Sequence, residues 1–175
     1  MKITRKTTCF LLALTLFFAA ACQTDKSYVL NEDTFFLVMT NMLYYPEQYV
    51  GADIEYDCFT YEIEDVKGEK YVCGVRKCSS EYGCACGNDT VIGLILSYDG
   101  EIPEPRNQRE NSPDKRWVHV KGRLRSAEMQ NISIYSVDEN GNSTGEVESI
   151  RFLVMEVAEI TEIEDYSGLK WYVTK

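Results

Sequence analysis

The segment at residues 54–63, IEYDCFTYEI, decides the fold class of this chain. Its β-branched and aromatic residues are typical of a β-strand. A second strand-like segment, KYVCGVRK at 70–77, follows the turn DVKG at 65–68. Two strand patterns on either side of a short turn predict a β-hairpin.

Three further segments have strand character. Thr90–Tyr98 is a nearly continuous apolar run, Arg116–Leu124 alternates apolar and polar residues, and Ile150–Ile163 is rich in valine and isoleucine. Polar loops are predicted between them, at 138–144 and at 99–115, where three prolines exclude a central strand. Five strand-like segments separated by polar loops favour a small barrel or a sandwich.

One helix is expected before the strands. Asn31 or Asp33 can cap it, and it carries apolar residues from Phe36 to Leu43. It should end before Pro46, because proline cannot continue a helix.

The predicted fold class is therefore mainly β: a small antiparallel OB-like barrel preceded by one helix. Residues 51–63 have the length of the long, bent first strand of such a barrel. A generic antiparallel sheet with one packed helix is the alternative. We expect one domain at residues 33–175, after a linker at 22–32.

The N-terminus has the order of a secretory signal. Three basic residues within positions 1–6 precede the apolar run from Phe10 to Phe18, and three alanines stand directly before Cys22. The apolar run is shorter than the roughly 20 residues of a membrane-spanning helix. Alanines before a cysteine resemble a lipobox, so residues 1–21 are predicted to be a lipoprotein signal peptide and Cys22 the lipidated residue. The alternative is a simple cleaved signal that leaves an ordinary cysteine.

The charge balance excludes some partner classes. The net charge of −10 becomes −13 without residues 1–21, because three basic residues and no acidic residue are removed. Such a chain repels phosphate backbones, so nucleic acid is not an expected partner. A protein, a cation or a neutral surface is favoured.

Four cysteines within 14 residues form the densest group of side chains that could bind a metal or react: Cys73, Cys78, Cys84 and Cys86. Four thiolates can surround zinc tetrahedrally, and soft ligands also suit copper. Asp89, Cys58 and the lone His119 are possible substitutes for a missing ligand. This cluster predicts a zinc or copper site.

Two other interpretations of the cysteines stay open. In a disulfide framework, Cys58 and Cys73 would lie near each other on paired strands if the register faces them together. In a redox-active Cys84-x-Cys86 pair, a thiolate would need nearby positive charge. His119, as the only histidine, is more typical of a solvated or packed strand residue than of a catalytic base.

Several short motifs stand in a fixed order along the chain: YPEQYVG at 45–51, FTY at 59–61, VRKC at 75–78, CACGND at 84–89, WVHVKG at 117–122, EITEI at 159–163 and WYV at 171–173. Together these motifs resemble the soluble C-terminal domain of YcgQ-type proteins, components of a bacterial permease system. The resemblance implies an extracytoplasmic OB-like domain and a permease as partner.

The expected function is that of a non-enzymatic, membrane-tethered binding domain on the extracytoplasmic face of the cell envelope. It would hold a soft metal or support a transporter. A disulfide-stapled interaction module is the main alternative, and a thiol-redox enzyme is the third. Gln23 after the lipidated residue, in place of aspartate, is compatible with the outer membrane in a cell with two membranes.

Overall fold

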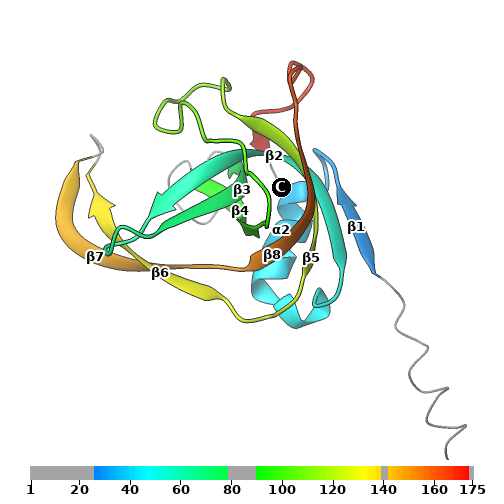
Figure 1. The fold of residues 1–175 in the computed structure, drawn as a ribbon, viewed down its shortest axis with the longest axis horizontal. Helices are drawn as coiled ribbons and strands as arrows, with labels where there is room; N and C mark the ends of the chain where they lie inside the picture. The colour runs from blue at the N-terminus through cyan, green and yellow to red at the C-terminus, as the bar shows by residue number, and fades with distance from the viewer. Residues whose placement is uncertain (1–25, 79–89, 139–141, 174–175) are drawn as a thin grey trace, which may run out of the picture.

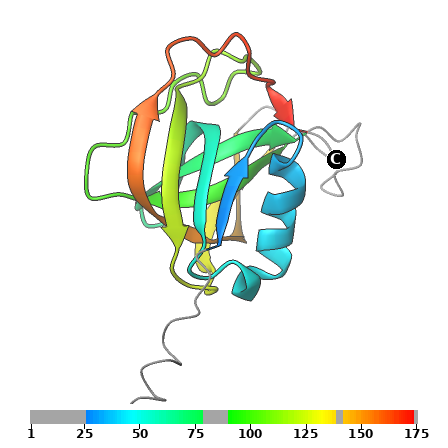
Figure 2. The same cartoon turned by 90° about the vertical axis from the view of Figure 1, so that its right-hand side faces the viewer.

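The computed structural model describes residues 26–78, 90–138 and 142–173. It consists of strongly curved strands, one α-helix beside them, and a two-stranded ribbon that extends to one side (Figures 1 and 2). The elements in chain order are β1 (Ser27–Leu30), α2 (Phe35–Tyr44), the short 3-10 helix η1 (Pro46–Gln48), β2 (Asp53–Glu64), β3 (Lys70–Cys78), β4 (Thr90–Ser97), β5 (Trp117–Leu124), β6 (Gln130–Val137), β7 (Ser143–Phe152), β8 (Val154–Glu162) and β9 (Tyr172–Val173).

Five strands pair in a circuit that returns to its start. β2 pairs with β5, β5 with β8, β8 with β4, β4 with β3, and β3 with β2. All of these pairs are antiparallel except β4–β8, which is parallel. β1 adds to β2 and β9 adds to β3, both in parallel.

The hairpin between β2 and β3 closes through a turn that its sequence explains. Gly68 adopts a φ of 83°, which favours glycine, and its N–H donates to the carbonyl of Asp65 at 3.0 Å. The Asp65 carboxylate accepts the N–H groups of Lys67 and Glu69, each at 2.8 Å. The predicted hairpin is confirmed, with Tyr61 opposite Cys73.

The helix is also confirmed. The Asn31 side chain accepts the N–H groups of Asp33 at 3.0 Å and Thr34 at 3.1 Å in the turn before α2. The N-cap residue itself is Thr34, so the expectation that Asn31 or Asp33 caps the helix was wrong. The helix ends at Tyr44, before Pro46. Neither helix in the described part of the chain combines the length and the apolar character of a membrane-spanning segment.

Alternation along β2 places successive side chains in two separate hydrophobic clusters. The interior cluster holds Tyr56 and Cys58 and receives Phe35, Met39 and Met42 from α2. A second cluster lies on the opposite face of the strands, around Phe59, Cys73, Val75, Ile95, Trp117 and Ile132. The ribbon of β6 and β7 covers part of it through Ile132, Ile134 and Ile150.

Three segments differ from the expected organisation. β1 occupies 27–30, inside the predicted linker, because its residues pair with β2 at Ser27–Asp53 through Leu30–Tyr56. β6 was not expected. The predicted single strand at 150–163 is the end of β7 followed by β8, with Leu153 fully buried between them.

Candidate functional site

A small cavity lies on the face of the second cluster, at the end of the domain capped by the loop 98–116 and the segment 163–171. Its volume is about 220 Å³. Phe59 and Tyr61 of β2 point to this face because they alternate with the inward Cys58 and Thr60. The lining residues are Phe59, Tyr61, Lys77, Val91, Gln108, Glu110, Lys115 and Trp171.

Lys115 is a buried cation in the wall of this cavity. Its residue is 2% exposed, and its ammonium donates to the carbonyl of Glu110 at 2.6 Å and to that of Asn107. The nitrogen also lies 5.3 Å from the centroid of the Trp171 ring. Burial, followed by the charge of Lys77, lowers the pKa of Lys115.

Lys77 brings a second ammonium to the same indole. Its nitrogen lies 5.5 Å from the Trp171 ring centroid and 5.7 Å from that of Tyr172, and it donates to the side chain of Asn111 at 2.8 Å. Lys77 reaches the cavity from β3, directly opposite Val91 of β4. Two like charges therefore share one aromatic ring, and each is stabilised by its negative face.

The aromatic wall is continuous. Trp171 stacks on Phe59 with ring centroids 6.3 Å apart, and Phe59 meets Trp117 edge-on at 5.5 Å. The Trp171 indole nitrogen is buried and has no hydrogen-bond partner among the described residues. Gln108 is oriented by its carbonyl oxygen, which accepts the N–H of Glu62 at 2.8 Å.

This arrangement suits a small organic anion. Two ammonium groups lie over the aromatic wall, and Glu110 is the one acidic residue among the described residues that line the cavity. An anion between the ammonium groups would offset their repulsion, and an apolar body would contact Phe59 and Trp171.

A comparison with protein families matched residues 18–140 to the family described as DUF1980 C-terminal domain. The match spans more than half of the 175 residues. The chain belongs to the DUF1980 C-terminal domain family. This membership agrees with the resemblance to YcgQ-type proteins. The DUF1980 match contains β1 to β6, whereas β7, β8 and β9 follow it in the chain. No curated protein and no solved structure matched the chain.

The predicted metal ligands are only partly within the described residues of this DUF1980 domain. Cys84, Cys86 and Asp89 lie outside them, as does Cys22. Cys58, Cys73 and Cys78 are free and buried. Among the residues the structure describes, no group of three or more histidine, cysteine or acidic side chains could hold a metal ion.

The strand geometry separates Cys73 from Cys78. They lie five residues apart on β3, which is about 17 Å along a strand, and they enter different hydrophobic clusters. Sulfur ligands of one zinc ion each lie about 2.3 Å from it. The structure therefore does not bring these two members of the expected four-sulfur site together.

The register of β2 and β3 also separates Cys58 from Cys73, the two cysteines of the alternative disulfide. Cys73 is opposite Tyr61, three positions from Cys58, and the two thiols belong to clusters on opposite faces of the strands. Both are free cysteines. The Cys58–Cys73 disulfide depended on a register that faces the two residues together, and this odd-numbered offset places them on opposite faces, because side chains alternate with a period of two.

Burial changes the chemistry of the three described thiols. It raises the pKa of Cys73 to about 12 and that of Cys78 to about 11, and it raises the pKa of Cys58 well above its ordinary range. Protonated buried thiols are weak nucleophiles and weak metal ligands. Their present environment is that of core residues.

His119 does not join the cysteines. It lies on the outer face of β5, where Nδ1 is 2.7 Å from the Asp57 carboxylate and Nε2 is 3.3 Å from that of Glu55. Asp53 and Arg123 form a bidentate pair on the same face, with both N–O distances 2.7 Å. His119 thus belongs to a row of cross-strand acid–base pairs between β2 and β5.

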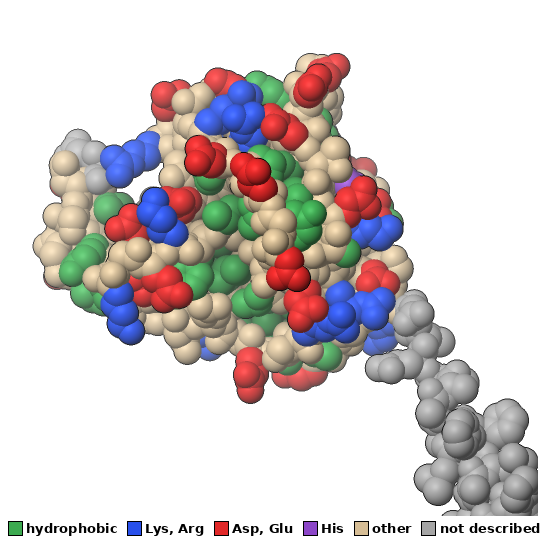
Figure 3. All heavy atoms as spheres, in the orientation of Figure 1, with side chains coloured by type: hydrophobic (Ala, Val, Ile, Leu, Met, Phe, Trp, Pro, Cys, Tyr) green, Lys and Arg blue, Asp and Glu red, His purple; other side chains and the backbone are tan. Residues whose placement is uncertain are grey.

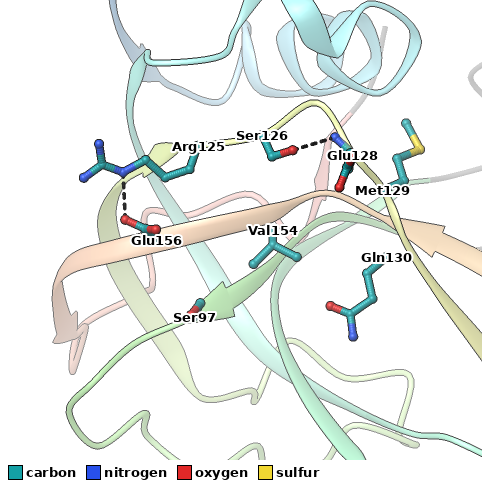
Figure 4. Close-up of a pocket in the computed structure, with 8 residues that line it drawn as sticks. All are labelled: Ser97, Arg125, Ser126, Glu128, Met129, Gln130, Val154 and Glu156. Carbon is teal, nitrogen blue, oxygen red and sulfur yellow. Dashed lines mark hydrogen bonds and ion pairs between the residues drawn. The ribbon is translucent and has the colours of Figure 1, made fainter.

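A second cavity, of about 340 Å³, lies beside the start of β6 (Figure 4). Arg125 and Glu156 pair across its rim at 2.7 Å, and the Ser126 hydroxyl accepts the N–H of Glu128 at 3.0 Å. Val154 and Met129 line it as well. Two of its three charged lining residues, Arg125 and Glu156, pair with each other, so it is a weaker candidate than the cavity at Trp171.

The sequence did not reveal the Lys115–Trp171 cavity. Lys115 falls in a loop predicted only as polar, and Trp171 is 112 residues from Phe59, the ring on which it stacks. The one feature of the sequence that could have indicated this cavity was the pair of adjacent aromatic residues Trp171 and Tyr172.

Proposed function

We propose that this protein is a non-enzymatic, membrane-tethered binding domain on the extracytoplasmic face of the cell envelope, and that its cavity binds a small organic anion. The observation that carries the ligand class is the placement of two ammonium groups, those of Lys77 and Lys115, within 5.5 Å of the Trp171 ring centroid. The chain as a whole carries a net charge of −10, so two ammonium groups at one ring form a local positive site on an acidic protein.

The pairing circuit supports the OB-like interpretation of the fold. The closed order β2–β3–β4–β8–β5–β2 supports this interpretation, because an OB-fold is a barrel of five strands. OB domains use the face of their second and third strands to bind ligands. Lys77 and Val91 come from the corresponding strands, β3 and β4.

Two parts of the proposal, the lipid anchor on Cys22 and the permease partner, are supported by the sequence. The signal pattern before Cys22 supports a lipid anchor, and the resemblance to YcgQ-type proteins supports an envelope permease as the protein partner. An anion-binding domain held at the membrane would suit a component that presents a small ligand to such a transporter.

Ligand binding is tested with benzoate, its uncharged amide, and acetate, using isothermal calorimetry and the tryptophan fluorescence of the purified protein. We expect benzoate to bind with a dissociation constant of about 0.1–10 mM, as suits a ligand of so few atoms. Benzamide should bind at least about tenfold more weakly, because it lacks the charge.

Matched variants locate the site. Lys77→Met should weaken benzoate binding, whereas Lys67→Met removes the same charge from the exposed turn after β2 and should leave binding unchanged. Equal affinity for benzoate and benzamide, or equal effects of the two lysine variants, would overturn the proposed ligand class.

A soft-metal centre is the second candidate, favoured by the position of Cys78 as the last residue of β3, directly before the segment that carries Cys84 and Cys86. Zinc or copper would have to displace the thiol proton of Cys78, whose pKa is raised to about 11. The metal content of the wild-type chain should then fall when Cys84 and Cys86 are both replaced by serine. The metal content should stay at the wild-type level in Cys73→Ser. Wild-type protein without metal after incubation with zinc or copper would exclude this candidate.

A further inference from the structure

Three exposed apolar side chains surround η1. Tyr44 is 75% exposed, Tyr45 is 56% exposed and Val50 is 42% exposed. The two tyrosine rings lie beside each other, with centroids 6.5 Å apart. Tyr44, Tyr45 and Val50, which flank η1 in the chain, are here called the η1 surface.

The chain is fixed to the fold next to this surface, at Lys26. Its carbonyl accepts the N–H of Asp53 at 2.9 Å, and its ammonium donates to the carbonyl of Gln48, in η1, at 2.9 Å. Only three residues, 23–25, separate Lys26 from Cys22. Four residue steps span at most about 14 Å, so a lipid on Cys22 would hold η1 close to the bilayer.

The opposite end of the domain carries the anion cavity. In Figures 1 and 2, the start of β1 and η1 lie at the lower end, whereas the later part of the loop 98–116 and the segment 163–171 lie at the upper end. An anchor at the lower end therefore leaves the cavity directed away from the membrane.

The charges near η1 do not form a basic patch. Two cations and one exposed acid lie here: Lys26, whose ammonium is bonded to the Gln48 carbonyl, Arg125, which is paired with Glu156, and Glu47 within η1. Arg125 directly follows Leu124, whose carbonyl accepts the Gly51 N–H. Acidic and basic side chains are also interspersed on the face shown in Figure 3. Any membrane contact here would depend on the tyrosine rings and Val50 rather than on attraction to anionic lipids.

We propose that the η1 surface lies in the interfacial region of the bilayer that carries the acyl chains of Cys22. The inference rests on the proposed lipid anchor. Tyrosine suits this region because its ring is apolar while its hydroxyl stays hydrated. The contact fixes the orientation of the domain, with the Trp171 cavity facing away from the lipid.

The test uses the full, lipidated chain in vesicles of phosphatidylethanolamine and phosphatidylglycerol, with and without bromine on the acyl chains. Bromine quenches tryptophan only at short range. The variant Tyr44→Trp places a reporter on the η1 surface, and the natural Trp117 and Trp171 report from the distant end. Tyr135→Trp is the matched control, because Tyr135 is 50% exposed on β6, which Figure 1 draws on the side away from β1.

In the Tyr44→Trp chain, we expect brominated lipid to quench the emission of the added indole at least about twofold, with little change for the wild type or for Tyr135→Trp. Replacing phosphatidylglycerol by phosphatidylcholine should not alter this result. Circular dichroism checks that each variant folds, and mass spectrometry of the same samples determines whether Cys22 is acylated.

The membrane contact of the η1 surface and the lipid anchor on Cys22 can be disproved separately. An acylated, vesicle-bound Tyr44→Trp chain whose added emission is not quenched overturns the membrane contact and leaves the anchor standing. A η1 surface covered by a partner protein would give that result too. A mass spectrum without acyl chains overturns the anchor, and the orientation with it.

Discussion

Arg76 of β3 and Glu32, which precedes α2, form an ion pair with a distance of 2.8 Å between Nη2 and Oε2. The Arg76 side chain is 2% exposed and that of Glu32 is 24% exposed. The guanidinium also lies 5.0 Å from the Trp117 ring centroid and donates to the carbonyl of Asp57 at 3.3 Å. One buried cation therefore connects β3, β2, β5 and the segment before the helix.

Glu32→Gln should lower the free energy of unfolding by about 1–3 kcal/mol, because it leaves the buried Arg76 without its carboxylate. The neighbouring pair Asp33–Lys170, at 3.9 Å with side chains 88% and 67% exposed, supplies the control. Asp33→Asn should change stability by less than about 0.5 kcal/mol. Urea unfolding measures both. Equal effects would show that the Arg76–Glu32 pair contributes no more than a surface contact.

The hairpin, the helix and the long loop at 99–115 could be predicted because each depends on neighbours in sequence. The turn at 65–68 contains its own aspartate and glycine, and Pro46 ends its own helix. β6 could not be predicted in this way, because Ser133, Tyr135 and Val137 are exposed and only Ile132 is fully buried. Its strand state depends on pairing with β7.

The site depended on relationships that the sequence does not contain. The cysteines were close in sequence, but alternation on β3 sends Cys73 and Cys78 to different clusters. Conversely, Trp171 and Phe59 are distant in sequence and stack in the fold. Sequence proximity therefore did not show that Cys73 and Cys78 lie in different clusters, and it concealed the aromatic cavity.

Gly93→Ala should destabilise the domain by at least about 3 kcal/mol. A Cβ at this position would fall on the carbonyl oxygen of Gly74 and lie 2.8 Å from the Val75 Cα, both of which are backbone atoms of the adjacent strand β3. Gly168→Ala is the control, since its Cβ would meet nothing within 4 Å. Thermal unfolding compares the two. A Gly93→Ala midpoint equal to that of Gly168→Ala would contradict the close approach of β3 and β4.

The thiols of Cys58, Cys73 and Cys78 should resist alkylation in the folded protein. At pH 8, a pKa raised from 9.0 to about 11 lowers the thiolate fraction of Cys78 about 100-fold. Burial further excludes the reagent. Iodoacetamide labelling followed by peptide mass spectrometry should show reaction at least about 100-fold slower than in 8 M urea. Rapid labelling of the folded chain at any of the three would contradict their burial.

Cys73 should make stability depend on alkaline pH. In the unfolded chain its thiol ionises near the ordinary value of 9.0, whereas burial raises the pKa in the folded protein to about 12. Below pH 9 both states keep the proton. Between pH 9 and 12 only the folded state keeps it, so unfolding releases a proton and rising pH favours unfolding. The stabilising contribution is thus complete below pH 9 and is lost as pH rises toward 12.

From pH 8.5 to 10.5, the free energy of unfolding should fall by about 1–2 kcal/mol less in Cys73→Ala than in the wild type. Val75→Ala is the matched control, because Val75 is also fully buried in the second cluster and does not titrate. It should lower stability at both pH values by similar amounts and keep the wild-type pH dependence. Urea titrations at pH 8.5 and 10.5 give the difference in unfolding free energy between each of the two variants and the wild type. An unchanged pH dependence in Cys73→Ala would mean that this thiol ionises alike in the folded and unfolded chain, contrary to its burial between β2 and β4.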